Sequence, residues 1–123
     1  MSRFYYCEKC GNMFGLLEDN HRPILCCGQE MVLVEPKVVE EGPYEKHIPD
    51  VKVEGDTIKV QVGSTVHPMV PEHYISWIYL ETENGGQRKV CKGTPTAEFV
   101  VINDKPIAVW SFCNLHGLWK KDL

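Results

Sequence analysis

The sequence predicts a mainly β protein in which a small cysteine-rich module precedes an antiparallel β-sandwich of immunoglobulin type. Short runs rich in β-branched and aromatic residues are separated by turn signals, and no helical period holds over a dozen residues. Four of the six cysteines lie within the first 27 residues. A segment this short buries too little apolar surface to fold unaided, so it needs a staple such as a bound metal.

Each strand of the sandwich is predicted from a local pattern. Residues 57–62 alternate in hydrophobicity, which places Ile58, Val60 and Val62 on one face of a strand. Further strands are expected at residues 74–80, 99–102 and 107–112. Turns are expected at residues 54–56, 84–86 and 103–106, which are rich in Gly, Asn, Asp and Pro.

The stretch from Pro36 to Pro43 has the composition of a linker, because it is polar, contains Gly42 and is flanked by prolines. We therefore expect the metal-binding module to occupy residues 1–36 and the sandwich to occupy residues 37–123.

Composition and charge argue against several classes of protein. A net charge of −4 disfavours a nucleic-acid partner, because nucleic-acid binders carry a basic surface. No apolar run is long enough to span a bilayer, and the N-terminus lacks the apolar region of a signal peptide. We therefore expect a cytoplasmic protein with no membrane association. Since disulfides are rare in the cytosol, the clustered cysteines are expected to bind metal.

The first predicted metal site consists of four cysteines. Cys7 and Cys10 form a CxxC turn, and the adjacent pair Cys26 and Cys27 follows after a loop. Four thiolates suit either zinc or a single iron, so a structural zinc site stays open as an alternative, as does a disulfide pair. Two neighbouring residues reach one ion only with strained angles, so a distorted tetrahedron is expected.

The second predicted metal site combines His47, His67, His73, His116 and Cys113. Taken singly, each histidine is more often a hydrogen-bonded structural residue than a metal ligand. Three of them lie close to prolines that stiffen their loops, and the cysteine lies three residues before the fourth. Structural zinc takes four ligands, so a fifth indicates a redox metal of larger coordination number, such as an octahedral iron with one position vacant.

Four segments resemble the signature segments of superoxide reductases, namely residues 45–49 (EKHIP), 67–69 (HPM), 72–75 (EHYI) and 113–120 (CNLHGLWK). Together with the four N-terminal cysteines, they resemble the desulfoferrodoxin family over essentially the whole chain. The resemblance implies a two-iron superoxide reductase with a desulforedoxin-like N-terminal domain, a β-sandwich catalytic domain and a homodimeric assembly.

The resemblance also implies an activity and its cofactors. Such an oxidoreductase reduces superoxide to hydrogen peroxide by one electron and protects against oxidative stress, with a rubredoxin-like protein as the electron donor. The catalytic iron would be bound by His47, His67, His73, His116 and Cys113. An electron-transfer iron would be bound by Cys7, Cys10, Cys26 and Cys27. Both irons would change between Fe²⁺ and Fe³⁺.

Glu45 and Lys46, which directly precede His47, are the candidate catalytic residues. A cation at Lys46 would attract the superoxide anion and orient a water that donates a proton, although a solvated surface lysine is the alternative interpretation. Glu45 would occupy the vacant position after oxidation and shield the ferric iron.

The alternative function is a copper or iron electron-transfer protein without catalysis. Cupredoxins are also β-sandwiches that use histidine, cysteine and methionine ligands. Four histidines exceed that ligand set, and no methionine follows His116. A zinc-stapled interaction module would explain the cysteine cluster alone. Cys91 has no histidine near it in sequence and is expected to be a small core residue or a free thiol.

Overall fold

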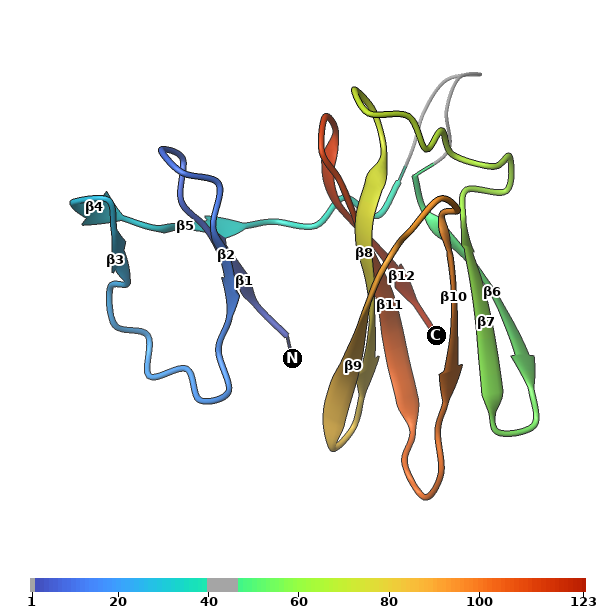
Figure 1. Cartoon of the computed structure of the whole chain (residues 1–123). Helices are drawn as coiled ribbons and strands as arrows, with labels where there is room; N and C mark the ends of the chain where they lie inside the picture. Colours follow the sequence, from blue (N-terminus) through green and yellow to red (C-terminus); the bar gives the residue numbers. More distant parts are fainter. Residues whose placement is uncertain (1, 40–46) are drawn as a thin grey trace. The chain divides into compact units, whose positions relative to one another are not determined.

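The computed structural model describes residues 2–39 and 47–123, so Glu45 and Lys46 lie outside the described residues. Within these ranges the chain forms twelve β-strands and no helix (Figure 1), which confirms the predicted mainly β fold. No helical segment able to cross a bilayer is found in the described part. The chain divides into two compact units, Met1–Glu35 and Pro36–Leu123.

The N-terminal unit is built on very short strands. Strand β1 (Phe4–Tyr6) lies between β2 (Met13–Gly15) and β5 (Val32–Val34), and both neighbours are antiparallel to it. A separate hairpin is formed by β3 (Leu25–Cys26) and β4 (Gln29–Glu30). Among the described residues of this unit, the only buried apolar side chains are Cys7 and Met31, so the unit has little apolar core of its own.

The second unit is a sandwich of two antiparallel sheets (Figure 1). The first sheet has the order β10-β7-β6 and comprises β6 (Pro49–Glu54), β7 (Thr57–Val62) and β10 (Thr96–Val100). The second has the order β12-β11-β8-β9 and comprises β8 (Ile75–Thr82), β9 (Gly85–Val90), β11 (Pro106–Cys113) and β12 (Gly117–Asp122).

The core of this unit lies between the two sheets. Ile58, Val60 and Val62 of β7 are buried, as the alternating pattern predicts. They pack with buried side chains of the neighbouring strand and of the opposite sheet, which include Phe99, Ile78, Leu80 and Val109. Burial of these side chains stabilises the unit by roughly 1.5–3 kcal/mol each.

A β-bulge in β8 lies opposite Cys113, at the end of β11. Phe112 pairs with Trp77 but Cys113 pairs with Ile75, so Ser76 of β8 is the extra residue. A bulge shifts the alternation of a strand by one residue. As a result Ile75 and Ile78, which are three residues apart on β8, both point into the core. The side chain of Cys113 is buried in the same core.

Candidate metal centres

The first two thiols of the N-terminal cluster come from a tight turn after β1. The amide of Gly11 donates a hydrogen bond of 2.9 Å to the carbonyl of Cys7, and the amide of Cys7 donates one of 2.9 Å to the carbonyl of Asn12. Gly11 has a φ of 82°, which glycine adopts without the strain that a side chain would cause. The closed turn brings Cys10 back toward Cys7.

The other two thiols come from the hairpin of β3 and β4. Cys26 pairs with Gln29, so Cys27 and Gly28 form a two-residue loop in which both residues have positive φ, 55° and 75°. This is the backbone pattern of a type I′ turn. In a continuous strand the side chains of Cys26 and Cys27 would point to opposite faces. The left-handed conformation of Cys27 instead leaves the two sulfur atoms 4.0 Å apart.

The spacing of the four thiols fits a tetrahedral metal ion. The sulfur atoms of Cys10 and Cys26 are 3.6 Å apart, and the ligand atoms of all four cysteines lie within 4.8 Å of one another. Four sulfur atoms bound at about 2.3 Å to one ion would be separated by about 3.8 Å. The four cysteines predicted from the sequence to share a metal therefore lie together in a suitable arrangement.

Two of these thiols have pKa values shifted in opposite directions. Backbone N–H groups, first that of Cys10, lower the pKa of the Cys7 thiol to about 6. The pKa of Cys27 is raised to about 12, mainly because its thiol shares a hydrogen bond with Cys10 and then with Cys7. A bound cation would displace the remaining protons, since thiolates are the ligand form of cysteine.

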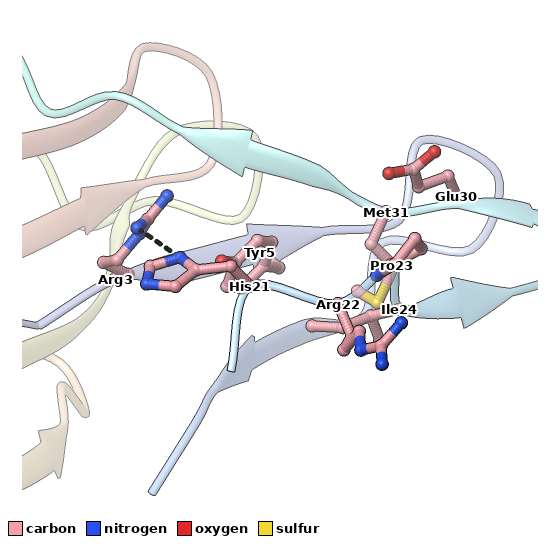
Figure 2. Close-up of a pocket in the computed structure, with 8 residues that line it drawn as sticks. All are labelled: Arg3, Tyr5, His21, Arg22, Pro23, Ile24, Glu30 and Met31. Carbon is pink, nitrogen blue, oxygen red and sulfur yellow. Dashed lines mark hydrogen bonds between the residues drawn. The ribbon is translucent and has the colours of Figure 1, made fainter. Parts of the chain in front are cut away.

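The long loop between the two cysteine pairs is fixed by Asp19. Its carboxylate accepts hydrogen bonds from the Tyr5 hydroxyl at 2.9 Å and from the backbone amide of His21 at 2.8 Å, and it lies 3.6 Å from Arg3. Arg3 and His21 are 3.2 Å apart and form a hydrogen bond, and both line a cavity of about 170 Å³. Figure 2 draws this bond and the residues around the cavity. Arg22 also lines this cavity.

In the second unit the four predicted histidines form a closed ring of imidazoles. Centroid separations around this ring are 4.8 Å from His47 to His67, 4.6 Å from His67 to His73, 4.9 Å from His73 to His116 and 4.8 Å from His116 back to His47. Neighbouring rings are steeply inclined, at 64° to 81°. The diagonal from His47 to His73 is 6.2 Å. Such a ring surrounds one common centre.

Cys113 completes this cluster. Its sulfur lies within 4.8 Å of the ligand atoms of His47, His67 and His73, and it is 3.9 Å from Nδ1 of His116. Nε2 of His47 and Nδ1 of His116 are 3.0 Å apart. Two nitrogens bound at right angles, each about 2.1 Å from an ion, would be separated by about 3.0 Å. The donor set and its spacing therefore fit a metal ion.

His47 is positioned from both sides. It lies two residues before β6, and the buried hydroxyl of Ser111 on β11 donates a hydrogen bond of 3.1 Å to its carbonyl. The indole of Trp119 on β12 stacks on the imidazole, with 4.7 Å between centroids and 12° between planes. Because these contacts link the two sheets, the packing of the sandwich fixes this ring.

His67 has its tautomer set by the backbone. Its Nδ1 lies 2.8 Å from the carbonyl of Pro68, and because a carbonyl only accepts, Nδ1 must carry the proton. The lone pair is then on Nε2, which is buried from solvent, as is Nε2 of His73. This is the arrangement expected of a histidine that binds a metal through one nitrogen and is oriented through the other.

The loop that carries His73 is attached to the turn between β11 and β12 by Asn114. Its Oδ1 accepts a hydrogen bond of 2.8 Å from the amide of Tyr74, and its Nδ2 donates one of 3.0 Å to the carbonyl of Glu72. The amide of Asn114 also donates to the carbonyl of Tyr74 at 3.2 Å. This clamp holds His73 beside Cys113.

The cluster is closed on one side and reaches the surface on the other. His47, His67 and Cys113 are buried, with exposures of 4%, 2% and 0%. His73 is half-buried and His116 is exposed. Among the described residues, His116 and His73 therefore form the side of the cluster that faces solvent.

Sequence reasoning did not single out three residues that organise this cluster. Asn114 and Trp119 lie within the segment 113–120, where their spacing from Cys113 and His116 was the available signal. Lys37, whose ammonium donates to the carbonyl of His116 at 3.0 Å, had no such signal. It lies 79 residues away from His116 in the sequence, and only the fold brings the two together.

Comparison with known proteins places the chain in a family. Residues 39–122 match the family model Desulfoferrodoxin. The chain is also 41% identical over 118 residues to the desulfoferrodoxin homolog of Archaeoglobus fulgidus, which covers 94% of this chain and 93% of that protein. The chain belongs to the desulfoferrodoxin family. The resemblance found in the sequence segments is thereby confirmed.

Several solved structures similar to this desulfoferrodoxin are named superoxide reductases. The crystal structure of the superoxide reductase from Treponema pallidum has 33% identity and a TM-score of 0.85, and the match covers 99% of this chain and 98% of that chain. The superoxide reductase (1Fe-SOR) from Giardia intestinalis has 32% identity and a TM-score of 0.54. That match covers 65% of this chain and 98% of the other.

Cys91 lies outside both clusters. It follows β9, is half-buried and packs against the sandwich core. Burial raises the pKa of its thiol to about 11. Of the two interpretations of the sequence, the free thiol is the one that fits, because Cys91 is unpaired and only partly buried at the edge of the core.

Proposed function

We propose that this desulfoferrodoxin is a superoxide reductase, which reduces superoxide by one electron to hydrogen peroxide. The observation that carries this proposal is the ring of four imidazoles with a buried thiol beside it, open to solvent on one side. Five donors exceed the four of a structural zinc site, and a one-electron reaction requires a redox metal such as iron.

The iron would be held by His47, His67, His73, His116 and Cys113. When bound there, it supplies the electron, and a thiolate ligand favours its donation. The protein's own part is to fix the donors before binding, through Ser111, Trp119, Asn114 and the carbonyl of Pro68. Fixed donors need little rearrangement when the charge of the site changes, which supports fast electron transfer.

A second iron would be held by Cys7, Cys10, Cys26 and Cys27 and would act as an electron-transfer centre. We assign residues 1–36 to this desulforedoxin-like domain and residues 37–123 to the catalytic domain. The division of the structure into two compact units supports the assignment. The electron donor would be a rubredoxin-like protein, and the assembly would be a cytoplasmic homodimer.

Glu45 and Lys46 would be the catalytic residues beside the iron. The support is their sequence position directly before His47. Lys46 would attract the superoxide anion and orient a proton-donating water, and Glu45 would shield the oxidised iron. Replacing Lys46 by alanine should slow the encounter with superoxide and flatten its dependence on ionic strength, and an unchanged rate would reject this role.

The proposal is tested by metal content and product stoichiometry. We expect two irons per chain and one hydrogen peroxide formed for each superoxide consumed, without release of dioxygen. Half that yield of peroxide together with dioxygen would indicate dismutation and contradict the proposal. Blue copper or colourless zinc in the purified protein would contradict it as well.

Two variants make the test specific to the cluster. His73→Ala removes one donor and should reduce the rate with superoxide at least about 100-fold, because loss of even a supporting group around a metal costs about 10- to 100-fold. His21→Ala is the matched control, since His21 is exposed and lies in the other unit. An equal loss in both variants would argue against the cluster as the site of reduction.

A further inference from the structure

Lys37 lies in the short segment that precedes His47 and is paired with the last strand of the sandwich. Its amide donates a hydrogen bond of 2.9 Å to the carbonyl of Leu118, and its carbonyl accepts one of 2.9 Å from the amide of Lys120. These two bonds form a bridge between Lys37 and Trp119 that runs parallel to β12. The backbone of Lys37 is therefore fixed against the strand that follows His116.

The side chain of Lys37 contacts the imidazole cluster in two ways. Its ammonium donates a hydrogen bond of 3.0 Å to the carbonyl of His116 and lies 5.0 Å from the centroid of the Trp119 ring. Trp119 donates to the same carbonyl at 3.1 Å through its indole nitrogen and stacks on His47. Lys37 thus touches His116 directly and His47 through Trp119.

An exposed lysine normally gains little from one fixed geometry, because ordering its long side chain costs entropy. Here two contacts of different kinds hold the same ammonium, a charge-assisted hydrogen bond and a cation–π contact. The ammonium of Lys120 on β12 is instead paired with a carboxylate, that of Asp122 at 3.2 Å, and lies 4.9 Å from the centroid of the Trp110 ring. The charge of Lys37 is held toward the histidine cluster.

We propose that Lys37 is a positioning residue of the iron site, which holds the His116 turn in place and favours the reduced iron through its fixed positive charge. This inference rests on the proposed function. A nearby cation disfavours the oxidation state with the greater positive charge, and it also attracts an approaching anion. Because Lys37 is exposed, salt should weaken the effect on the anion.

The test separates the charge from the contacts of the side chain. Lys37→Met removes the charge but keeps an apolar stem on Trp119, and Lys37→Arg keeps the charge. Lys105→Met is the matched control, because it removes one charge at the opposite end of β11 from Cys113. The readouts are the midpoint potential of the His/Cys iron, from its visible spectrum, and the rate with superoxide at several ionic strengths.

For Lys37→Met we expect a lower midpoint potential, equivalent to a roughly two- to fivefold smaller ratio of reduced to oxidised iron at fixed ambient potential. The rate with superoxide should fall about twofold at low salt and return toward the wild-type rate at high salt. Lys37→Arg should restore both properties, and Lys105→Met should change neither.

Equal potentials in Lys37→Met and Lys105→Met would overturn the proposal, and so would a Lys37→Arg variant that behaves like Lys37→Met. If Lys37→Met loses iron, Lys37→Gln takes its place, because an amide can still donate to the His116 carbonyl. Failure of the proposed function would instead be visible in the wild-type protein, as missing iron or absent peroxide formation. The two failures are therefore distinguishable.

Discussion

Single residues with unusual backbone or hydrogen bonding set the geometry of both clusters. The left-handed conformation of Cys27 explains how two adjacent cysteines reach the same site. Two neighbouring cysteines in sequence predict a strained site but do not reveal how the strain is accommodated. The answer depends on Gly28, which completes the type I′ turn at no steric cost.

Asp19 is the residue whose charge should matter most for the loop between the cysteine pairs. The backbone amide of His21 and the hydroxyl of Tyr5 hold the pKa of its carboxyl below the usual range. Because this pKa is lower in the folded than in the unfolded chain, ionised Asp19 stabilises the folded state. The stabilisation is fully present at pH values above the unfolded pKa of about 3.9. That stabilisation is lost as the pH falls through the folded pKa.

We therefore predict that Asp19→Asn loosens residues 16–24 at neutral pH, because the charged acceptor is lost. Hydrogen–deuterium exchange at the amide of His21 should accelerate several-fold at pH 7 and approach the wild-type rate in acid, where the wild type also loses the charge. Glu18→Gln removes the neighbouring charge and is the control. Equal protection of this amide in wild type and Asp19→Asn would refute the role of Asp19.

At the scale of elements, strands with a regular pattern were predictable and the others were not. The alternation in residues 57–62 predicted β7 together with its buried face. Strands β1 to β5 have two or three residues each, which is too short to show a period. Strand β9 (Gly85–Val90) is mostly exposed and carries no apolar alternation, so its pairing with β8 defines it.

The turn predicted at residues 84–86 lies one residue earlier in the structure. Residues 84–86 were expected to form a turn, but Thr82 pairs with Gly85, so the turn consists of Glu83 and Asn84. Gly86 pairs with Glu81 as a strand residue, and it is a glycine because Tyr79 lies over it and leaves no space for a Cβ. A glycine needed for a close approach has the same sequence signature as one needed for a turn.

The connection between the His73 loop and the turn from β11 to β12 leads to a prediction at this scale. Asn114→Ala removes two hydrogen bonds between these elements, at a cost of about 1–2 kcal/mol in stability. Because the loop then holds His73 less firmly, iron should be lost to a chelator about tenfold faster. Urea unfolding and iron release measure the two effects.

Asn84→Ala is the matched control, since Asn84 donates to Asp104 at the end of the sandwich away from Cys113. It should cost some stability but leave iron release unchanged. If Asn114→Ala releases iron at the wild-type rate, the clamp does not determine the position of His73.

At the scale of the whole molecule, the sequence identified the donor side chains better than the residues that orient them. Histidine and cysteine are recognisable as donors by type, so His47, His67, His73, His116 and Cys113 could be grouped before the fold was known. Ser111 and Lys37 act through a hydroxyl and an ammonium that occur widely in proteins. Their roles depend on contacts over 64 and 79 residues of sequence, which only the folded chain creates.

The two units are expected to hold their metals independently, because each cluster draws all its donors from one unit. The family match, residues 39–122, also lies within the second unit.

Replacing Cys10 and Cys27 by serine in the full chain should therefore remove one iron and destabilise the N-terminal unit, which has little apolar core of its own. The iron of the His/Cys cluster, its visible spectrum and its direct reaction with superoxide should stay within about twofold of wild type. Metal analysis gives the iron content and stopped-flow measurements give the rate with superoxide on the same sample. Loss of both irons together would contradict independent binding and would show that the sandwich needs the N-terminal metal for its own stability.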